Sequence, residues 1–326
     1  MAIRRDISTD DGARETFVRG VLLLKAEDTG LTTTDLGIEP VAGAPAQPLA
    51  TWDLFVLWHL AAMNEFTPPG GGARNAAHMG AVFLPWHRWM LMLLEANLQR
   101  VLDDPEAGLP YWDWAADGEL PIDEQPRARV WADDCMGGDG NPERSFELET
   151  GPFGAGAGFN LRITSDAEGQ AVAIDRPLRR RQSFSRGIGL PTNSDVKLAL
   201  ELPDYDADPW DNNSEGFRNT LEGWVPSTTA PNLHNRVHVC IGGDMGSAAS
   251  PNDPLFYLNH CNVDRIWAMW QTRNPDAGYL PGADSPEDLK RHRIADDMFS
   301  LFTDVAATPQ DMLDVATIYS YDRLAG

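Results

Sequence analysis

Basic residues, lysine above all, are scarce in this chain of 326 residues. Only 26 Lys and Arg stand against 49 Asp and Glu, and lysine occurs only at Lys25, Lys197 and Lys290. The formal net charge of −23 repels the phosphate backbone of nucleic acids and anionic lipid head groups. The composition therefore argues against a nucleic-acid partner. We expect the one dense basic run, Arg179-Arg180-Arg181, to be a solvated loop.

Long apolar runs and a cysteine framework are also missing. No stretch of about eighteen apolar residues occurs, so we expect no membrane-spanning helix. The first residues lack the apolar segment of a secretory signal, so we expect a cytoplasmic protein from the given sequence. The alternative is export together with a partner protein. The three cysteines, Cys135, Cys240 and Cys261, match neither a disulfide framework nor a Cys-x-x-Cys zinc site, and we expect free thiols.

Aromatic and apolar residues, by contrast, gather in three blocks that should supply the core. These blocks are residues 52–115, 217–241 and 253–271. Apolar residues at helical spacing predict helices near 52–63 and 82–101. Asp253-Pro254 predicts a third helix start, because Asp can accept from the first backbone N–H groups and proline suits the first helical position.

The stretch between 135 and 194 is rich in glycine and predicts long irregular loops, with a short hairpin near 161–174. No internal repeat or low-complexity linker divides the sequence. We therefore expect a single domain over residues 1–326 that is mainly α-helical, with minor β-structure.

Six of the seven histidines fall on the expected helices or beside them: His59, His78, His87, His234, His238 and His260. His234 and His238 are four residues apart, so one helix face projects both rings, although such a pair alone is weak evidence for a metal. His87 and His260 lie in strongly apolar stretches, where a titratable ring is costly unless it is hydrogen-bonded or bound to metal. Taken together, the six predict a metal centre. The seventh, His292, lies among charged residues, and we expect it on a solvated face.

The donor set narrows the choice of metal. Six imidazoles, without a cysteine or an obvious bridging carboxylate, suit copper or zinc. Two trios of histidines, one from each half of the chain, could hold two copper ions that face each other. Two adjacent Cu(I) ions can each give one electron to dioxygen. The residues therefore point to oxygen activation.

Longer motifs around the histidines resemble those of tyrosinases, the type-3 dicopper polyphenol oxidase family, and most closely its compact bacterial members. Around the first trio these motifs are Trp58-His59-Leu60, Arg74-Asn75-Ala76-Ala77-His78-Met79 and Phe83-Leu84-Pro85-Trp86-His87-Arg88. Around the second trio they are Asn232-Leu233-His234-Asn235-Arg236-Val237-His238 and the run from Asp253 to Trp267.

The resemblance implies a four-helix-bundle core around two copper ions, with dioxygen as co-substrate. By this match the first copper region covers about 52–100, and its ligands are His59, His78 and His87. The second covers about 230–271, and its ligands are His234, His238 and His260. Tyr319-Ser320-Tyr321 resembles the element that closes the catalytic domain in relatives, so we expect no C-terminal shielding domain.

Two positions depart from the family pattern. Asn259 stands before the ligand His260, where many relatives have a second histidine. The hydrogen-bond donor beside the ligand therefore differs from that of these relatives, but copper binding should survive. Ala76 stands where fungal and plant members have a cysteine that forms a thioether with a copper ligand. That crosslink is excluded here, as is usual in the bacterial group.

Hydroxylation of a monophenol requires loss of its phenolic proton to a base or an ordered water. The resemblance implies that Asn235 and Glu222 hold such a water, and the alternative for Glu222 is a surface charge at a helix end. An enlarged loop at 225–231 separates Glu222 from the second trio and makes this role less direct. We expect Asp264 and Arg265 to form a structural ion pair.

Three further residues are expected to shape the substrate pocket. Phe256 lies one helical turn before His260 and should pack on the site, where the family uses a phenylalanine to limit the approach of the substrate ring. Small residues such as Ala248 leave the entrance roomy. Val239 offers no charge to a carboxylate-bearing substrate, which favours uncharged or bulky phenols.

The expected function is that of a dicopper oxidoreductase that ortho-hydroxylates monophenols and oxidises o-diphenols to o-quinones with dioxygen. The first alternative is a catechol or o-aminophenol oxidase with little monophenolase activity. A haemocyanin-like oxygen-binding protein and a zinc hydrolase are more remote. The expected partners are small phenols and catechols, and a copper chaperone and a homodimer stay open.

Overall fold

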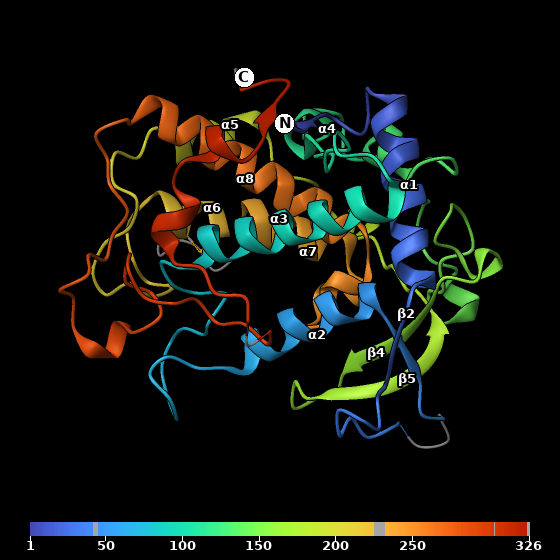
Figure 1. Ribbon diagram of the computed structural model, residues 1–326. Coiled ribbons are helices and arrows are strands. Elements are labelled where there is room, and N and C mark those ends of the chain that lie inside the picture. Colours follow the sequence, from blue (N-terminus) through green and yellow to red (C-terminus); the bar gives the residue numbers. More distant parts are fainter. Residues whose placement is uncertain (42–44, 225–231, 303, 325–326) are drawn as a thin grey trace.

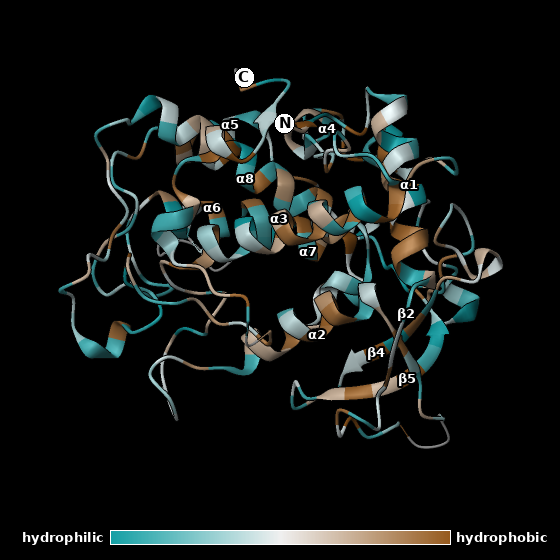
Figure 2. Ribbon diagram, viewed as in Figure 1, coloured by the Kyte–Doolittle hydropathy of each residue, from teal (hydrophilic) through white to brown (hydrophobic). Residues whose placement is uncertain are grey.

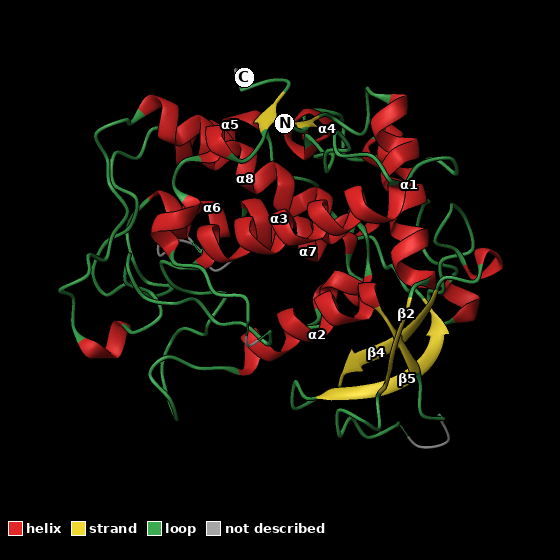
Figure 3. Cartoon of the chain, viewed as in Figure 1, coloured by secondary structure: helices red, strands yellow, loops and turns green. Residues whose placement is uncertain are grey.

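Helices dominate the computed structural model, which describes residues 1–41, 45–224, 232–302 and 304–324 (Figure 3). The α-helices in these ranges are α1 (Asp11–Ala26), α2 (Thr51–Asn64), α3 (Phe83–Leu102), α4 (Trp114–Gly118), α5 (Asn193–Leu200), α6 (Phe217–Glu222), α7 (Leu233–Ile241) and α8 (Leu255–Arg273). Short 3-10 turns lie in the connecting loops, among them η6 (Gly243–Gly246) and η7 (Ser250–Asn252). The mainly α-helical fold expected from the sequence is confirmed. None of the helices in the described part is long and apolar enough to cross a membrane.

The strands form three small pairs. They are β1 (Ile3–Arg4) with β6 (Ser320–Tyr321), β2 (Asp28–Thr32) with β3 (Pro48–Ala50), and β4 (Asn160–Ser165) with β5 (Ala171–Pro177). The first pair is parallel and brings the two ends of the chain together (Figure 1). The β4–β5 pair is antiparallel and confirms the hairpin expected near 161–174, with a second strand that continues to Pro177.

The core is built around α3 and α8, which lie side by side at the centre of the molecule (Figure 1). α7 packs on α8, and α2 lies alongside the central helices with its tryptophan Trp58 edge-to-face against Trp86 and Trp89 of α3. α8 is buried from Leu255 to Trp270. Figure 2 shows hydrophobic stretches along α1, α2 and the central helices. Burial of these large apolar surfaces is the main force that holds the helices together.

The expected helix starts agree closely with the structure. α2 and α3 begin within one residue of the expected 52 and 82. α8 begins at Leu255 rather than at Asp253, but an Asp253 carboxylate oxygen does accept a hydrogen bond from the Leu255 backbone N–H (3.0 Å). The aspartate therefore satisfies one of the free N–H groups at this helix end, as its position predicts.

The expectation of a solvated Arg179-Arg180-Arg181 loop was wrong for its middle residue. Arg180 is fully buried and binds both carboxylate oxygens of Asp253, at 2.7 and 2.8 Å. Its neighbour Arg181 is exposed. In an extended segment successive side chains point to opposite sides, so one arginine turns inward to the start of α8 while the next faces water.

The expected Asp264–Arg265 ion pair was also wrong, because adjacent residues on a helix point in different directions. Asp264 is buried and binds Arg88 of α3 (2.5 Å) and Arg4 of β1 (3.4 Å). Arg265 instead pairs with Asp113, at 3.2 Å. Asp264 therefore ties α8 to α3 and to the start of the chain.

Candidate active site

Six histidines form two buried triads in the middle of the helical core. The first is His59, His78 and His87, and the second is His234, His238 and His260. Within each triad the potential ligand atoms lie within 4.8 Å of one another. The triads face each other, and the rings of His87 and His260 stack with centroids 4.1 Å apart. The structure therefore brings together all six histidines that the sequence singled out.

Backbone carbonyls orient three of the rings. Through Nδ1, His59, His87 and His238 hydrogen-bond to the carbonyl oxygens of Ala248 (2.7 Å), Phe83 (2.8 Å) and Met245 (2.7 Å), respectively. A carbonyl accepts but cannot donate, so each Nδ1 carries the proton and each Nε2 carries a lone pair. These Nε2 atoms are buried and have no hydrogen-bond partner among the described residues. Such oriented, unpartnered ring nitrogens fit a metal ion.

The second triad contains a close pair of ring nitrogens. His234 Nε2 lies 3.1 Å from His260 Nε2. His234 Nδ1 lies 3.1 Å from the carbonyl oxygen of Glu222 and 3.0 Å from Oδ1 of Asn235, which keeps the proton on Nδ1. The Nε2 lone pair of His234 therefore points to the same space as His260, where a shared cation would satisfy both.

The electrostatic environment keeps the rings neutral. Burial lowers the pKa of all six histidines, and it lowers the pKa of His59 to about 3. A charged imidazole loses its hydration in such a site. Neutral imidazole is the form that binds metal, so the triads are ready for a metal at neutral pH.

His78 is held by a loop rather than a helix. Oδ1 of Asn75 accepts hydrogen bonds from the backbone N–H groups of Ala77 (3.0 Å) and His78 (2.7 Å), and this local turn replaces helical scaffolding. The next residue, Met79, has a positive φ of 59°. This left-handed conformation is uncommon for methionine, and the N–H of Met79 donates a hydrogen bond to Glu222 of α6.

The seventh histidine supports the same loop, and its expected solvated position was wrong. His292 is fully buried, its Nε2 hydrogen-bonds to Thr67 Oγ1 (2.7 Å), and its Nδ1 accepts from the Val82 N–H (3.4 Å). Its ring lies so close to Gly80 that any side chain there would collide with it. The charged residues next to His292 in the sequence suggested an exposed position, although the side chain points into the protein.

Acid should weaken the fold through His292. Burial, with Arg74 and Arg218 nearby, lowers its pKa to about 3, whereas an unfolded histidine titrates near 6.5. Below about pH 6.5 the unfolded state binds a proton that the folded state does not, so stability falls with pH, by about 2 kcal/mol at pH 5. Urea unfolding of metal-free wild type and His292→Gln at pH 7.5 and pH 5 measures this. The variant should lose about 2 kcal/mol less than wild type on acidification, and equal losses would contradict the assignment.

Glu222 is not the surface charge that was considered for it. Its side chain is buried, Oε1 accepts from the Met79 N–H (2.6 Å), and Oε2 accepts from Arg218 Nη1 (3.1 Å). Burial raises the pKa of this carboxyl group, although the arginine lowers it. The enlarged loop expected at 225–231 lies outside the described residues.

The expected pocket residues surround the triads in different ways. The Phe256 ring packs 4.2 Å from the ring of His260 and 4.9 Å from that of His59. Val239 is 38% exposed, while Ala248 is half-buried and its carbonyl orients His59. Asn259 is fully buried, and neither polar atom of its amide has a partner within the described ranges.

Comparison with known proteins places this site in a family. Residues 49–273 match the family model of the common central domain of tyrosinase. The chain is 40% identical to a tyrosinase of Streptomyces glaucescens over 274 residues, 83% of this chain and 88% of the relative. The chain belongs to the tyrosinase family.

Two further proteins extend the comparison. A grixazone synthase of Streptomyces griseus is 36% identical over 83% of this chain and 90% of its own length. A polyphenol oxidase variant from Thermothelomyces thermophila shares the fold, with a TM-score of 0.72, 22% identity, and coverage of 99% of this chain and 89% of that one. As a tyrosinase-family protein, the chain is an enzyme of the type-3 copper polyphenol oxidase class, and its two buried triads fit the copper sites.

Three kinds of site residue in this tyrosinase-family chain could not be found from the sequence. Arg218 stands four residues before Glu222, a spacing that can pair them on a helix, but its full burial and its contact with Asp206 arise only from the fold. His292 is surrounded in the sequence by charged residues, which pointed to the surface. The carbonyls of Met245 and Ala248 belong to the backbone, which no side-chain pattern reveals.

Proposed function

We propose that this chain oxidises small phenols with dioxygen, by ortho-hydroxylation of monophenols and oxidation of o-diphenols to o-quinones. The two triads would each hold one copper ion through their ring nitrogens. Bound copper supplies the electrons that reduce dioxygen and an electrophilic position for a phenolate oxygen. The observation that carries this proposal is the pair of facing buried triads with unpartnered nitrogen atoms.

The protein's own residues would orient the ligands and handle the proton. The carbonyls of Ala248, Phe83 and Met245 fix the tautomers of three ligands. The Phe256 ring, packed on His260, restricts the angle at which a phenol enters. Asn235 and Glu222 both contact His234, and we assign to them the water that takes the phenolic proton.

A second candidate function is a catechol or o-aminophenol oxidase. The polar atoms assigned to the water already have protein partners: Asn235 Oδ1 faces His234, and the Glu222 carboxylate accepts from Met79 and Arg218. A carboxylate oxygen has a second acceptor site, so a water can still bind. A weaker hold on that water would favour diphenols, which need no hydroxylation.

Oxygen uptake on a monophenol and its matched o-diphenol tests the proposal. Copper-loaded wild type should consume oxygen with both substrates. Asn235→Ala should lower monophenol turnover about 10²-fold or more and diphenol turnover far less. The reason is that the held water is assigned to the phenolic proton that a monophenol must lose before hydroxylation, whereas the protons of a diphenol can leave with the reduced oxygen as water. Asn97→Ala, which removes a half-buried asparagine from the outer face of α3, serves as the control and should change neither rate.

The outcomes separate the two functions. Uptake by wild type on the diphenol alone would support the catechol or o-aminophenol oxidase. A proportional loss of both rates in Asn235→Ala would remove the water-holding role from this residue.

A further inference from the structure

Glu222, the last residue of α6, contacts both halves of the metal site. Its carboxylate accepts a hydrogen bond from the N–H of Met79, the residue directly after His78 of the first triad. Its own backbone carbonyl lies 3.1 Å from Nδ1 of His234 in the second triad. One residue therefore bridges the loop that carries His78 and the helix that carries His234.

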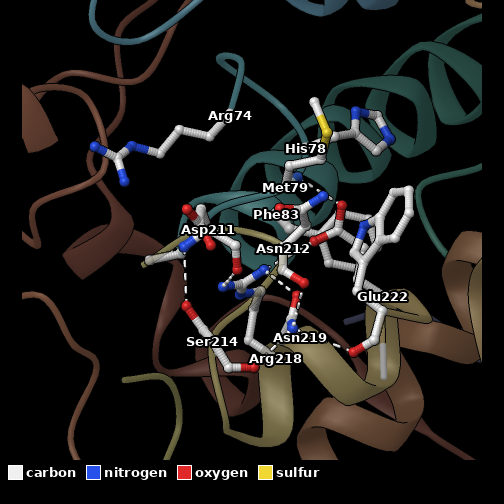
Figure 4. A network of polar contacts seen from close by, with 12 residues as sticks. Arg74, His78, Met79, Phe83, Asp211, Asn212, Ser214, Arg218, Asn219 and Glu222 are labelled. Atoms are coloured by element: carbon white, nitrogen blue, oxygen red, sulfur yellow. Dashed lines mark hydrogen bonds and ion pairs between the residues drawn. The ribbon is translucent and has the colours of Figure 1, made fainter. Parts of the chain in front are cut away.

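The carboxylate of Glu222 is itself held in place. Arg218, one turn earlier on α6, donates to it and is fully buried (Figure 4). Asp206 accepts from the same guanidinium at 2.7 to 3.0 Å, and the carbonyl of Asp211 accepts at 3.0 Å. A buried guanidinium with several acceptors in fixed directions has little freedom to move, so it fixes its carboxylate partners as well.

The loop of His78 depends on such contacts more than the other ligands do. His59, His87, His234, His238 and His260 lie on helices, whose backbone hydrogen bonds fix them. His78 lies outside any helix, and the left-handed Met79 next to it is a sparsely populated conformation. The contact from Met79 to Glu222 links this ligand's loop, through Glu222, to His234 of the opposite triad.

We propose that Glu222 is a positioning residue that sets the separation of the two histidine triads, with Arg218 and Asp206 holding its carboxylate. The proposal rests on the assignment of the triads as copper sites. It does not depend on the role of Glu222 toward the substrate proton, because it acts through Met79 and His234 and needs no substrate. Its test therefore uses copper alone.

The chain offers a matched control for the removal of this carboxylate. Glu95 on α3 is also buried, and it also accepts from one guanidinium (Arg4, 2.9 Å) and one backbone N–H (Leu109, 2.7 Å). It lies eight residues beyond His87 on the same helix, about 12 Å along the axis. Glu95→Ala therefore removes the same kinds of contact away from the triads.

Copper titration and electron paramagnetic resonance of the oxidised proteins give the readout. Two Cu(II) ions held close together couple and give little signal, whereas uncoupled ions give the signal of isolated Cu(II). In Glu222→Ala we expect the affinity for the second copper to fall about 10- to 100-fold, and the signal per bound copper to rise. Glu95→Ala should lose stability but bind two coupled ions like wild type.

Three results would overturn the proposal. One is a Glu222→Ala protein that binds two ions with wild-type affinity and wild-type signal. If that variant does not fold, Glu222→Gln takes its place. The amide oxygen of glutamine can accept from only one of the two donors, Met79 or Arg218, so we expect a smaller change in the same direction. The second result that would overturn the proposal is a Glu222→Gln protein with wild-type copper affinity and a wild-type spectrum. A wild type and a Glu95→Ala protein that both lack a coupled copper pair would overturn the copper assignment and this proposal with it.

Discussion

Replacement of His238 or His260 with alanine is expected to remove about one copper ion per chain and to bring oxygen uptake on phenols down to background. Each ring belongs to a triad, and two remaining imidazoles leave the ion without a third anchor. Removal of His238 also leaves the Met245 carbonyl without its imidazole donor, which loosens η6. Metal analysis of the purified variants, with both copper and zinc counted, measures the loss.

His292 provides the control for this experiment. It is as buried as the ligands but binds Thr67 and Val82 instead of facing the triads. The glutamine of His292→Gln can still hydrogen-bond to Thr67 beside the His78 loop, so this variant should retain two copper ions per chain, which would show that the loss is specific to the triads. Full retention of both ions in His238→Ala and His260→Ala would refute the ligand assignment, and zinc in place of copper would favour a hydrolase.

The largest loss of stability is expected from Asp264→Asn, at about 3–5 kcal/mol of unfolding free energy. Burial raises the pKa of Asp264, but Arg88 and Arg4 lower it more, so the carboxylate is charged in the folded protein. The hydroxyl groups of Tyr319 and Tyr321 also donate to it. The neutral amide would leave the buried guanidinium of Arg88 without its acidic partner, and that of Arg4 with Glu95 alone.

Urea unfolding at neutral pH measures this effect. Asp134→Asn is the control, because it breaks a two-point contact with Arg129 at the exposed surface, where water replaces the lost partner. We expect little change in that variant. A loss in Asp264→Asn no larger than that of the control would show that the buried network adds nothing to stability.

The histidine positions were predictable because a metal constrains both residue type and spacing. A spacing of four on α7 places His234 and His238 with ring centroids 4.5 Å apart. The apolar residues around His87 and His260 in the sequence are sufficient to indicate that both rings are buried. The helices that carry them were also predicted to within two residues at their starts: α3 from the periodicity of its apolar residues and α8 from Asp253-Pro254.

The partners of buried charges were not predictable in the same way. Arg180, Asp264 and His292 were each assigned from the residues next to them in the sequence, and each assignment was wrong. Asp264 meets Arg4 across 260 residues, so nothing local indicates the pair. A charged side chain enters the interior only when a distant partner meets it there.

The sequence by itself determined the fold class, the family, and the six histidines that meet at the centre of the protein. Periodicity and residue chemistry are local properties, so they are written directly in the chain. The tertiary structure alone decided how the ligand rings are oriented and how the two triads are joined. The contact of His59 with the Ala248 carbonyl and the bridge from Glu222 to Met79 form only between segments far apart in the sequence. Such contacts depend on how the helices and loops pack, and packing is a property of the whole chain.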